Sequence, residues 1–176
     1  MRIIGGEWRR RLLEFPDAPD LRPTPDRVRE TLFNWLGQDL SGETCLDLFA
    51  GSGALGFEAA SRGAKHAVLV EHSATVVRTL HANRTMLSAQ QVEIVRADAM
   101  DFLQADARRY DVVFLDPPFR LDLLPRVLPL LGRILLPGAR VYLESDVVPE
   151  PVAGFELLKQ ARAGQVHSLL LKWQRA

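Results

Sequence analysis

The architecture of this chain follows from residues 44–56, TCLDLFAGSGALG. An apolar run predicts a buried strand over residues 44–49, and the pattern that follows predicts a helix over residues 54–62. The turn between them contains the pattern G-x-G-x-x-G, at Gly51, Gly53 and Gly56. Glycines at this point allow a tight turn and a close approach of a ligand to the backbone. A strand, a glycine turn and a helix in this order predict a nucleotide-binding unit.

Strands and helices alternate with short links after this unit. Further strands are expected over residues 67–70, 92–96, 110–115 and 140–144, and further helices over residues 73–86 and about 121–131. Residues 156–160 and 166–173 are expected to form an antiparallel pair at the sheet edge. The pattern predicts a Rossmann-like, doubly wound α/β fold with a mainly parallel seven-stranded sheet. Ligands of such sheets bind beyond the carboxyl ends of the strands.

The first 40 residues are expected to form an extension, followed by a catalytic domain over residues 41–176. Residues 2–4 and 10–15 can pair as a hairpin around Gly5-Gly6, and a proline-rich linker follows. A helix is expected to reach about Leu36, with Thr24 as its cap and Pro25 as its first residue.

The composition excludes several classes of protein. With 176 residues, the chain is too short for two full domains of ordinary size. Its 22 Lys and Arg balance 22 Asp and Glu, which excludes a uniformly basic surface but not a local basic patch. The single cysteine, Cys45, excludes an intramolecular disulfide, and the four histidines show no metal-ligand spacing. Without a signal peptide or a membrane-spanning stretch, we expect a cytoplasmic protein that needs no metal.

Acidic residues follow or interrupt three of the expected strands. Glu71 lies 18 residues after Gly53, where a carboxylate accepts hydrogen bonds from the hydroxyls of a ribose. Asp47 interrupts an apolar strand, and its buried charge suits a cationic or amine-bearing ligand such as the methionine end of S-adenosylmethionine. Asp98, with the backbone of Ala99 beside it, is a candidate acceptor for an adenine amino group. The alternative role of Asp98 is to cap the helix that follows it.

The sequence Asp116-Pro117-Pro118-Phe119 comes directly after the expected strand 110–115. The two prolines remove two N–H groups and leave a carboxylate, carbonyl oxygens and an aromatic ring. Asp116 and the Pro117 carbonyl can accept the two hydrogens of an exocyclic amine, while Phe119 stacks on the base. Holding the amine in this way activates it by positioning and electrostatics. The alternative interpretation of Asp-Pro-Pro is a simple turn.

Basic residues concentrate near the start of the chain. An aromatic ring among arginines suits RNA phosphates and unpaired bases, although a solvated charged face is the plainer interpretation. The candidate RNA-binding residues are Arg2, Trp8, Arg9, Arg10, Arg11, Arg22 and Arg27.

These motifs together resemble those of a known family. LDLFAGSGALGFEAASRGA, Glu71, Asp98-Ala99 and DPPF are similar to class I S-adenosylmethionine-dependent methyltransferases that modify exocyclic amines. RIIGGEWRRRLL and LRPTPDRVRETLFNWL resemble the RsmD family of bacterial small-subunit rRNA guanine-N2 methyltransferases. The resemblance implies methylation of one guanine in 16S rRNA, within a partly assembled small subunit, and no membrane partner. It also implies a catalytic set of Asp116, Pro117 and Phe119, and cofactor contacts from Asp47, Phe49, Gly51, Ser52, Gly53, Glu71, Asp98 and Ala99.

Other functions remain open at this stage. G-x-G-x-x-G with a following acid also fits an NAD-dependent oxidoreductase, although no residues are left over for a separate catalytic domain. Proline-centred loops like DPPF also serve enzymes that methylate DNA adenine or protein glutamine. A non-catalytic RNA-binding assembly factor with a vestigial cofactor site is a third class, which the intact DPPF disfavours.

Overall fold

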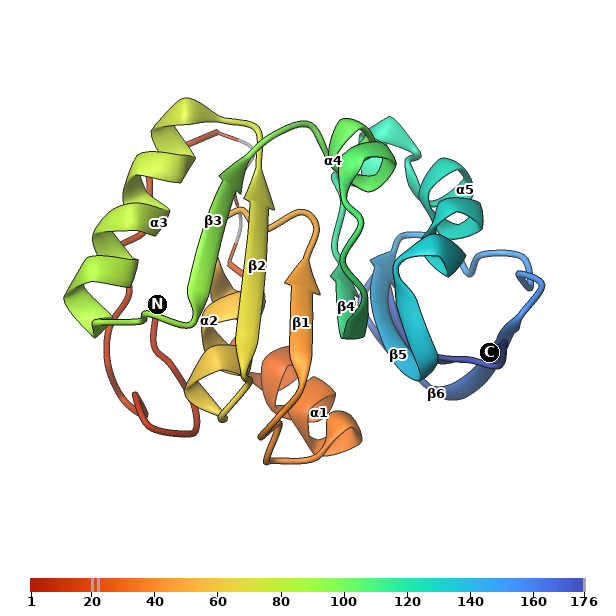
Figure 1. Cartoon of the computed structure of the whole chain (residues 1–176), viewed down its shortest axis with the longest axis horizontal. Coiled ribbons are helices and arrows are strands. Elements are labelled where there is room, and N and C mark those ends of the chain that lie inside the picture. Colours follow the sequence, from red (N-terminus) through yellow and green to blue (C-terminus); the bar gives the residue numbers. More distant parts are fainter. Residues whose placement is uncertain (20, 22, 176) are drawn as a thin grey trace.

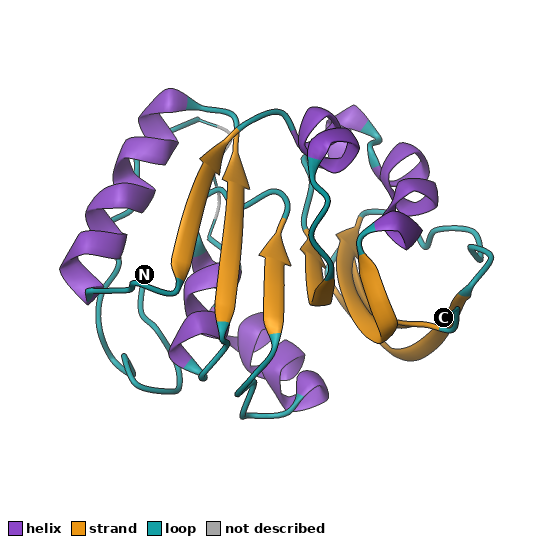
Figure 2. Cartoon of the chain, viewed as in Figure 1, coloured by secondary structure: helices purple, strands orange, loops and turns teal. Residues whose placement is uncertain are grey.

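Seven strands form one sheet with helices on both faces (Figures 1 and 2). The computed structural model describes residues 1–19, 21 and 23–175. The strand order is β3-β2-β1-β4-β5-β7-β6, and β7 runs antiparallel to β5 and to β6. The predicted fold class is therefore confirmed. The strands are β1 (Thr44–Asp47), β2 (His66–Glu71), β3 (Val92–Arg96), β4 (Tyr110–Leu115), β5 (Leu135–Ser145), β6 (Phe155–Ala163) and β7 (Val166–Trp173).

The centre of the sheet is parallel and buried on both faces. Leu46 of β1 pairs with Val68 of β2 on one side and with Val113 of β4 on the other, and none of the three side chains is exposed. Two faces of buried apolar side chains explain why these strands appear as continuous apolar runs in the sequence. The parallel register also brings the carboxyl ends of β1, β2 and β4 to one edge.

The helices cover the two faces of this sheet. One apolar core holds side chains of the first three helices, and a second core on the opposite face holds those of the fourth and fifth. The helices are α1 (Asp26–Leu36), α2 (Ala54–Ser61), α3 (Ala74–Leu87), α4 (Ala99–Ala105) and α5 (Leu124–Val127). In the part of the chain that the structure describes, no helix is long and apolar enough to cross a membrane.

Two expectations for helices are wrong. The helix predicted near residues 121–131 is the single turn of α5 between two 3₁₀ segments, Phe119–Leu121 and Leu128–Arg133. Pro125 and Pro129 cannot donate backbone hydrogen bonds there, so a long α-helix does not form. At α1, Pro25 takes the cap position and Asp26 begins the helix, with no hydrogen bond from a capping side chain.

The predicted N-terminal hairpin forms, with a wider turn than Gly5-Gly6 alone, and it packs on α2. Its two sides pair at an antiparallel bridge, Arg2 with Leu12, and the N–H groups of Ile3 and Leu13 donate to the carbonyls of Arg11 and Met1. Gly6 has a φ of 79°, and a Cβ there would lie 1.9 Å from the Ser61 carbonyl oxygen. The hairpin pairing and this contact with α2 together determine the path of the loop.

Glu58 of α2 holds this loop against the rest of the molecule. Its carboxylate accepts hydrogen bonds from the backbone N–H of Ile4 (3.0 Å) and of Gly5 (2.8 Å). It also pairs with the guanidinium groups of Arg29 (3.4 Å) and Arg62 (3.0 Å). None of the Glu58 side chain is exposed, and both arginine side chains are also buried. One buried carboxylate thus joins the N-terminal loop, α1 and the end of α2.

Replacing Glu58 with glutamine is expected to lower the free energy of unfolding by about 3–5 kcal/mol, because the buried guanidinium of Arg62 loses its counter-ion and that of Arg29 keeps only Asp26. Urea unfolding followed by circular dichroism measures this change. The matched control is Glu7→Gln, because Glu7 is an exposed glutamate of the same loop. The control should change stability by less than about 0.5 kcal/mol. Equal effects of the two substitutions would contradict the role given to Glu58.

Candidate active site

The loops that follow the parallel strands meet at one edge of the sheet (Figure 1). The structure links Gly51 to Glu71 by a hydrogen bond, and the charges of Asp47 and Glu71 interact. Asp116, at the end of β4, lies close enough to Asp47 for their charges to interact as well. Candidate residues from three neighbouring strands are therefore brought together, as the parallel topology predicted.

The glycine loop has the backbone that its sequence predicted. Gly51 and Gly53 have φ values of 53° and 80°, which side-chain-bearing residues adopt at a cost. A Cβ on Gly51 would lie 2.8 Å from Leu21, so glycine also keeps this position open. Gly56 serves packing instead, because a Cβ there would lie 2.5 Å from Leu69 of β2. Two of the three glycines shape the loop, and the third lets α2 approach the sheet.

Ser52 faces inward from this loop. Its hydroxyl accepts a hydrogen bond from the Ala54 N–H at 3.3 Å, and its side chain is buried. The contact supports the first turn of α2, so the hydroxyl of Ser52 is engaged within the protein.

Glu71 is a rigid carboxylate at the end of β2. Its oxygens accept hydrogen bonds from the backbone N–H of Gly51 (3.0 Å) and of Ser73 (2.9 Å). His72 Nδ1 lies 3.2 Å from one of them, and the glutamate side chain is 10% exposed. Both oxygens keep further acceptor capacity, because a carboxylate offers about four lone-pair sites. Glu71 therefore orients the glycine loop and can still accept hydroxyl hydrogens.

Asp47 is buried beside the same loop. Its carboxylate accepts a hydrogen bond from the Gly56 N–H at 2.9 Å. Burial raises the pKa of Asp47 to about 7, the charge of Glu71 raises the pKa further, and the Gly56 bond acts against both. The carboxyl group is thus only partly ionised near neutral pH, and a cation bound nearby would favour its charged form.

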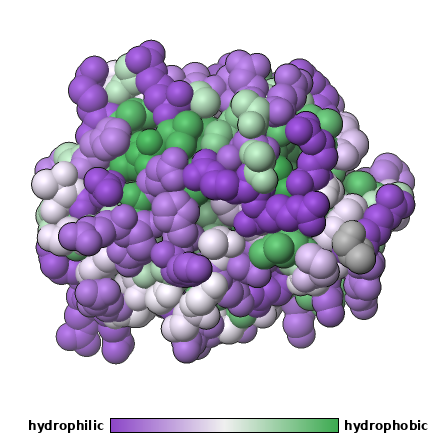
Figure 3. Space-filling model, in the orientation of Figure 1, coloured by the Kyte–Doolittle hydropathy of each residue, from purple (hydrophilic) through white to green (hydrophobic). Residues whose placement is uncertain are grey.

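Asp98 acts as a helix cap, as the alternative interpretation held. One oxygen, Oδ1, accepts hydrogen bonds from the N–H groups of Met100 (2.8 Å) and Asp101 (3.1 Å), and α4 begins at Ala99. Asp98 itself is exposed. Half-buried apolar side chains border this side of the edge and pack against the second core, namely Phe49, Val95, Ala97, Ala99 and Met100. Figure 3 shows apolar side chains reaching the surface over β2 and β3.

The DPPF segment leaves β4 as a rigid turn. Pro117 is buried, Pro118 is exposed, and the half-buried Phe119 begins the 3₁₀ segment. The hydroxyl of Thr24 makes a hydrogen bond to the carboxyl group of Asp116. Thr24, expected to cap α1, thus contacts the DPPF segment instead.

Sequence reasoning missed three polar side chains, which a chain of hydrogen bonds links to Asp116. They are Glu144, Tyr142 and Ser168. A hydrogen bond joins the carboxyl groups of Asp116 and Glu144 of β5. The Tyr142 hydroxyl donates to Glu144 Oε1 at 2.8 Å, and Ser168 Oγ of β7 lies 3.2 Å from that hydroxyl. Tyr142 and Glu144 are two residues apart in a strand and therefore share a face. That spacing was a visible signal, but the contact with Ser168 depends on the antiparallel register of β5 and β7.

The candidate RNA-binding residues divide into two groups. Arg2, Arg9, Arg10, Arg11 and Arg27 are exposed. Trp8 is not available to RNA, because its ring is buried in the first core and its backbone N–H donates to Ser61 Oγ at 3.0 Å. Arg22 lies outside the described residues.

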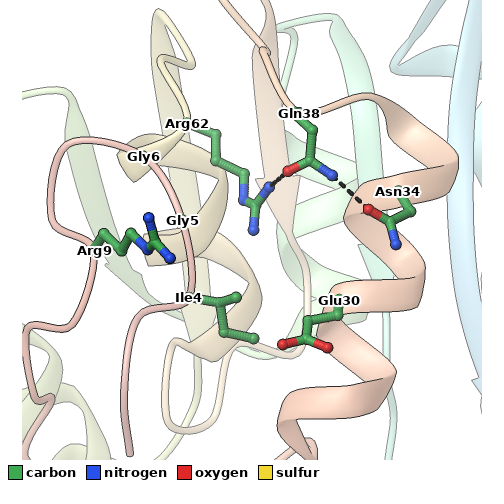
Figure 4. Close-up of a pocket in the computed structure, with 8 residues that line it drawn as sticks. All are labelled: Ile4, Gly5, Gly6, Arg9, Glu30, Asn34, Gln38 and Arg62. Carbon is green, nitrogen blue, oxygen red and sulfur yellow. Dashed lines mark hydrogen bonds between the residues drawn. The ribbon is translucent and has the colours of Figure 1, made fainter.

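A pocket of about 360 Å³ opens between the N-terminal loop and α1 (Figure 4). Arg9 and Arg62 lie on one side of it, and the Gln38 side chain bridges Arg62 and Asn34 on the other. Arg62, which lines the pocket, accepts the Leu40 N–H at its backbone carbonyl, and Leu40 lies just before the start of β1. The pocket is therefore near the amino ends of the strands, whereas Asp116 follows the carboxyl end of β4. Among the described residues, no group of three His, Cys, Asp or Glu side chains could hold a metal ion.

Comparison with known proteins adds an independent line of evidence. The sequence model of the family described as "Conserved hypothetical protein 95" matches residues 1–172. "Ribosomal RNA small subunit methyltransferase D" of Escherichia coli (strain K12) is 47% identical over 171 residues, which cover 94% of this chain and 86% of that protein. Its counterpart of the same name in Haemophilus influenzae is 42% identical over 177 residues, covering 94% and 90%.

A solved structure agrees with these sequence matches. The "Putative methyltransferase yhhF from Escherichia coli" superposes with a TM-score of 0.91 at 45% identity, covering 99% of this chain and 98% of that one. The match extends through the N-terminal loop, the glycine turn and the antiparallel edge. This protein therefore belongs to the RsmD family, which the model of conserved hypothetical protein 95 describes.

Proposed function

We propose that this protein transfers a methyl group from S-adenosylmethionine to the exocyclic N2 amine of a guanine in small-subunit (16S) rRNA. The observation that carries the proposal is the position of Asp116 and its prolines at the end of β4, beside the glycine loop and Asp47. Small-subunit rRNA is the substrate named for the relatives from Escherichia coli and Haemophilus influenzae. The chemistry of the DPPF segment supports an exocyclic amine as the acceptor, and the N2 atom of guanine is what the resemblance to the RsmD family implies.

The residues around the glycine loop fit S-adenosylmethionine. The positive φ values of Gly51 and Gly53 turn the loop tightly at the end of β1, and Glu71 offers acceptors to the two ribose hydroxyls. Asp47 would face the positive methionine end, and the half-buried apolar side chains around Phe49 suit the adenine ring. Asp98 Oδ2 and the Ala99 backbone remain candidates for the adenine amino group. When bound, the cofactor supplies a methyl group already activated on a sulfonium.

The DPPF segment would hold the target base. Asp116 and the carbonyl of Pro117 accept the two amine hydrogens, and the ring of Phe119 stacks on the guanine. An aromatic amine is a weak nucleophile because its lone pair is delocalised into the ring. Fixing both hydrogens on acceptors aims the nitrogen at the methyl carbon and stabilises the positive charge that develops on it.

Recognition of the rRNA would come from residues 1–40, while residues 41–176 bind the cofactor and the target base. A chain with no net charge needs a local patch to attract RNA, and the exposed Arg9, Arg10 and Arg11 provide one. Arg2 and Arg27 are further exposed candidates for RNA contacts. Because so short an extension offers limited contact area, we propose a partly assembled small subunit as the substrate, where folded rRNA and proteins present a shaped surface.

The decisive experiment compares acceptors. Labelled methyl transfer should be measured with naked 16S rRNA, with small subunits and with duplex DNA, followed by nucleoside analysis. N2-methylguanosine from small-subunit rRNA is the expected product. Methylated adenine from DNA, or no transfer to any acceptor, would contradict the proposal.

Replacing Asp116 with alanine should lower the rate of methyl transfer by about 10²–10³-fold, because the amine loses the acceptor of one of its hydrogens. Calorimetry should show unchanged binding of S-adenosylmethionine. The control is Asp146→Ala, an exposed aspartate just beyond β5, which should keep the wild-type rate. A wild-type rate in purified Asp116→Ala would remove Asp116 from the catalytic set.

Replacing Arg9, Arg10 and Arg11 together with alanine should weaken binding to small-subunit rRNA. The slope of log K against log salt should become shallower by about 0.7–0.9 for each phosphate that the variant no longer neutralises. A salt titration of RNA binding measures both effects.

The control for this triple variant removes the same charge elsewhere. Arg78 of α3, Arg109 of the loop before β4 and Arg126 of α5 are exposed. Their joint replacement with alanine should leave the salt slope nearly unchanged. Identical slopes for the two triple variants would mean that net charge, and not the N-terminal loop, attracts RNA.

Binding of S-adenosylmethionine at pH 7 should release protons from Asp47. The free protein has a pKa of about 7 at this carboxyl, so a substantial fraction is protonated, and a bound cation lowers that pKa. Calorimetry in two buffers of different ionisation enthalpy counts the protons released. Asp47→Asn keeps an acceptor for the Gly56 N–H but cannot ionise, so its proton release should fall. An unchanged proton count would place the cation away from Asp47.

A further inference from the structure

A second carboxyl lies beside the one that would hold the target amine. Glu144 of β5 is 7% exposed, and the pairing of Leu115 with Leu143 places it next to Asp116. A hydrogen bond joins the two carboxyl groups. Two carboxylates repel each other, so a hydrogen bond between two carboxyl groups requires that one of them be protonated. The pair therefore shares one proton and carries a single negative charge.

Hydroxyl groups surround the pair and support that single charge. Tyr142 donates to Glu144 Oε1 at 2.8 Å, and the Tyr142 oxygen can in turn accept from Ser168, whose Oγ lies 3.2 Å away. Thr24 bonds to Asp116 from the segment before α1. The pair is thus held by hydroxyl donors from three segments of the chain.

Further acidic groups face the pair from the neighbouring strands. Asp47 of β1 acts on Asp116 as a nearby charge, and Glu71 of β2 acts in turn on Asp47. Each negative charge on these neighbours disfavours a second negative charge on the pair. The surroundings therefore favour the state in which Asp116 and Glu144 keep one proton between them.

We propose that Glu144 is a positioning residue for Asp116: it shares a proton with Asp116, fixes the plane of its carboxyl group and takes up a proton through it during methyl transfer. The inference rests on the proposed function and extends it from the amine-holding loop to β5 and β7. The contact between the two carboxyl groups carries it: Leu115 of β4 pairs with Leu143 of β5, so the residues that follow them, Asp116 and Glu144, lie side by side at the carboxyl ends of the two strands.

The proton balance of the reaction requires such an acceptor. The amine nitrogen forms a bond to the methyl carbon while the bond between methyl and sulfur breaks, and that electron pair stays on sulfur. The nitrogen then carries a positive charge and must lose one of its two hydrogens as a proton. Asp116 accepts this proton on one oxygen as the shared proton passes from its other oxygen to Glu144. The pair becomes neutral and later returns one proton to solvent.

The environment makes this pair a stronger base than an exposed carboxylate. Burial raises the pKa of Asp116 well above its ordinary value, and the charge of Glu144 raises it further. Burial also raises the pKa of Glu144, while its hydrogen bonds from Tyr142 and Asp116 lower it. The two carboxyl groups therefore titrate as a pair, and the Tyr142 donor favours the state in which the pair carries its single negative charge.

The first test removes the Tyr142 hydroxyl. In Tyr142→Phe, Glu144 loses a donor that stabilises its charged form, so the first ionisation of the pair moves to higher pH. The acidic limb of the kcat profile for methyl transfer to small-subunit rRNA should move upward with it. Tyr110→Phe is the matched control, because Tyr110 is a buried tyrosine that donates to Asp106 at 2.6 Å near the start of β4. The acidic limb of the kcat profile of Tyr110→Phe should lie at the same pH as in the wild type.

The second test replaces Glu144 with glutamine and measures the protonation of the Asp116 carboxyl directly. Carbon-13 NMR of the Asp116 carboxyl should show titration at lower pH than in the wild type, because the neighbouring negative charge is gone. The value of kcat should fall by roughly 10- to 100-fold, because a displaced or unsupported catalytic group costs about that much. KM for S-adenosylmethionine should not change. Glu150→Gln, an exposed glutamate in the loop after β5, should match the wild type in all three measurements.

The outcomes separate this inference from the proposed function. If wild-type protein methylates the rRNA but both variants keep its pH profile, its kcat and its Asp116 titration, the role of Glu144 is wrong. If wild-type protein transfers no methyl group, the proposed function is wrong, and an Asp116 titration unchanged in Glu144→Gln would still reject the shared proton. Should Glu144→Gln not fold, the Tyr142→Phe profile decides the question alone.

Discussion

The parallel pairing of β1 with β2 and β4 is the constraint on which the rest of this structure depends. It buries the paired residues Leu46, Val68 and Val113 at the centre of the sheet. Polar side chains of these strands therefore gather where the strands end. Parallel strands end at one edge, so loops that are far apart in the sequence meet there. The glycine turn, Glu71 and the DPPF segment form one site for this reason, and each alone would be an ordinary turn.

A single buried carboxylate gives the N-terminal loop its place. Glu58 binds two backbone N–H groups of the loop and the guanidinium groups of Arg29 and Arg62. Because all these groups are out of water, the arrangement holds only when every charge and hydrogen bond is matched. The arginines at the tip of the loop are thereby presented to solvent while Trp8 is anchored in the core.

Acidic side chains accumulate at the carboxyl edge of the sheet although the chain as a whole is neutral. Burial raises the pKa values of Asp47, Asp116 and Glu144, so charging them all in the free protein is unfavourable. The unfavourable charging of these carboxyl groups is consistent with a proposed cofactor that is a cation and a proposed reaction that releases a proton. Burying these carboxylates raises the free energy of the free protein, and that penalty falls when the cationic cofactor and the amine bind and provide partners for them.

Sequence periodicity and glycine spacing were sufficient to predict the doubly wound sheet, the loop at Gly51 and the site edge, because those features depend on local patterns that repeat along the chain. They failed where distant contacts prevail: Trp8 is buried by the packing of its loop on α2, and Thr24 turns to Asp116 instead of capping α1. Pro125 and Pro129 were visible, yet their effect on the predicted helix was underestimated. The sequence by itself determined which residues follow each strand. Only the tertiary structure decided that Glu144, Tyr142 and Ser168 join Asp116, because these contacts require the register of β4 against β5 and of β5 against β7, which no local pattern specifies.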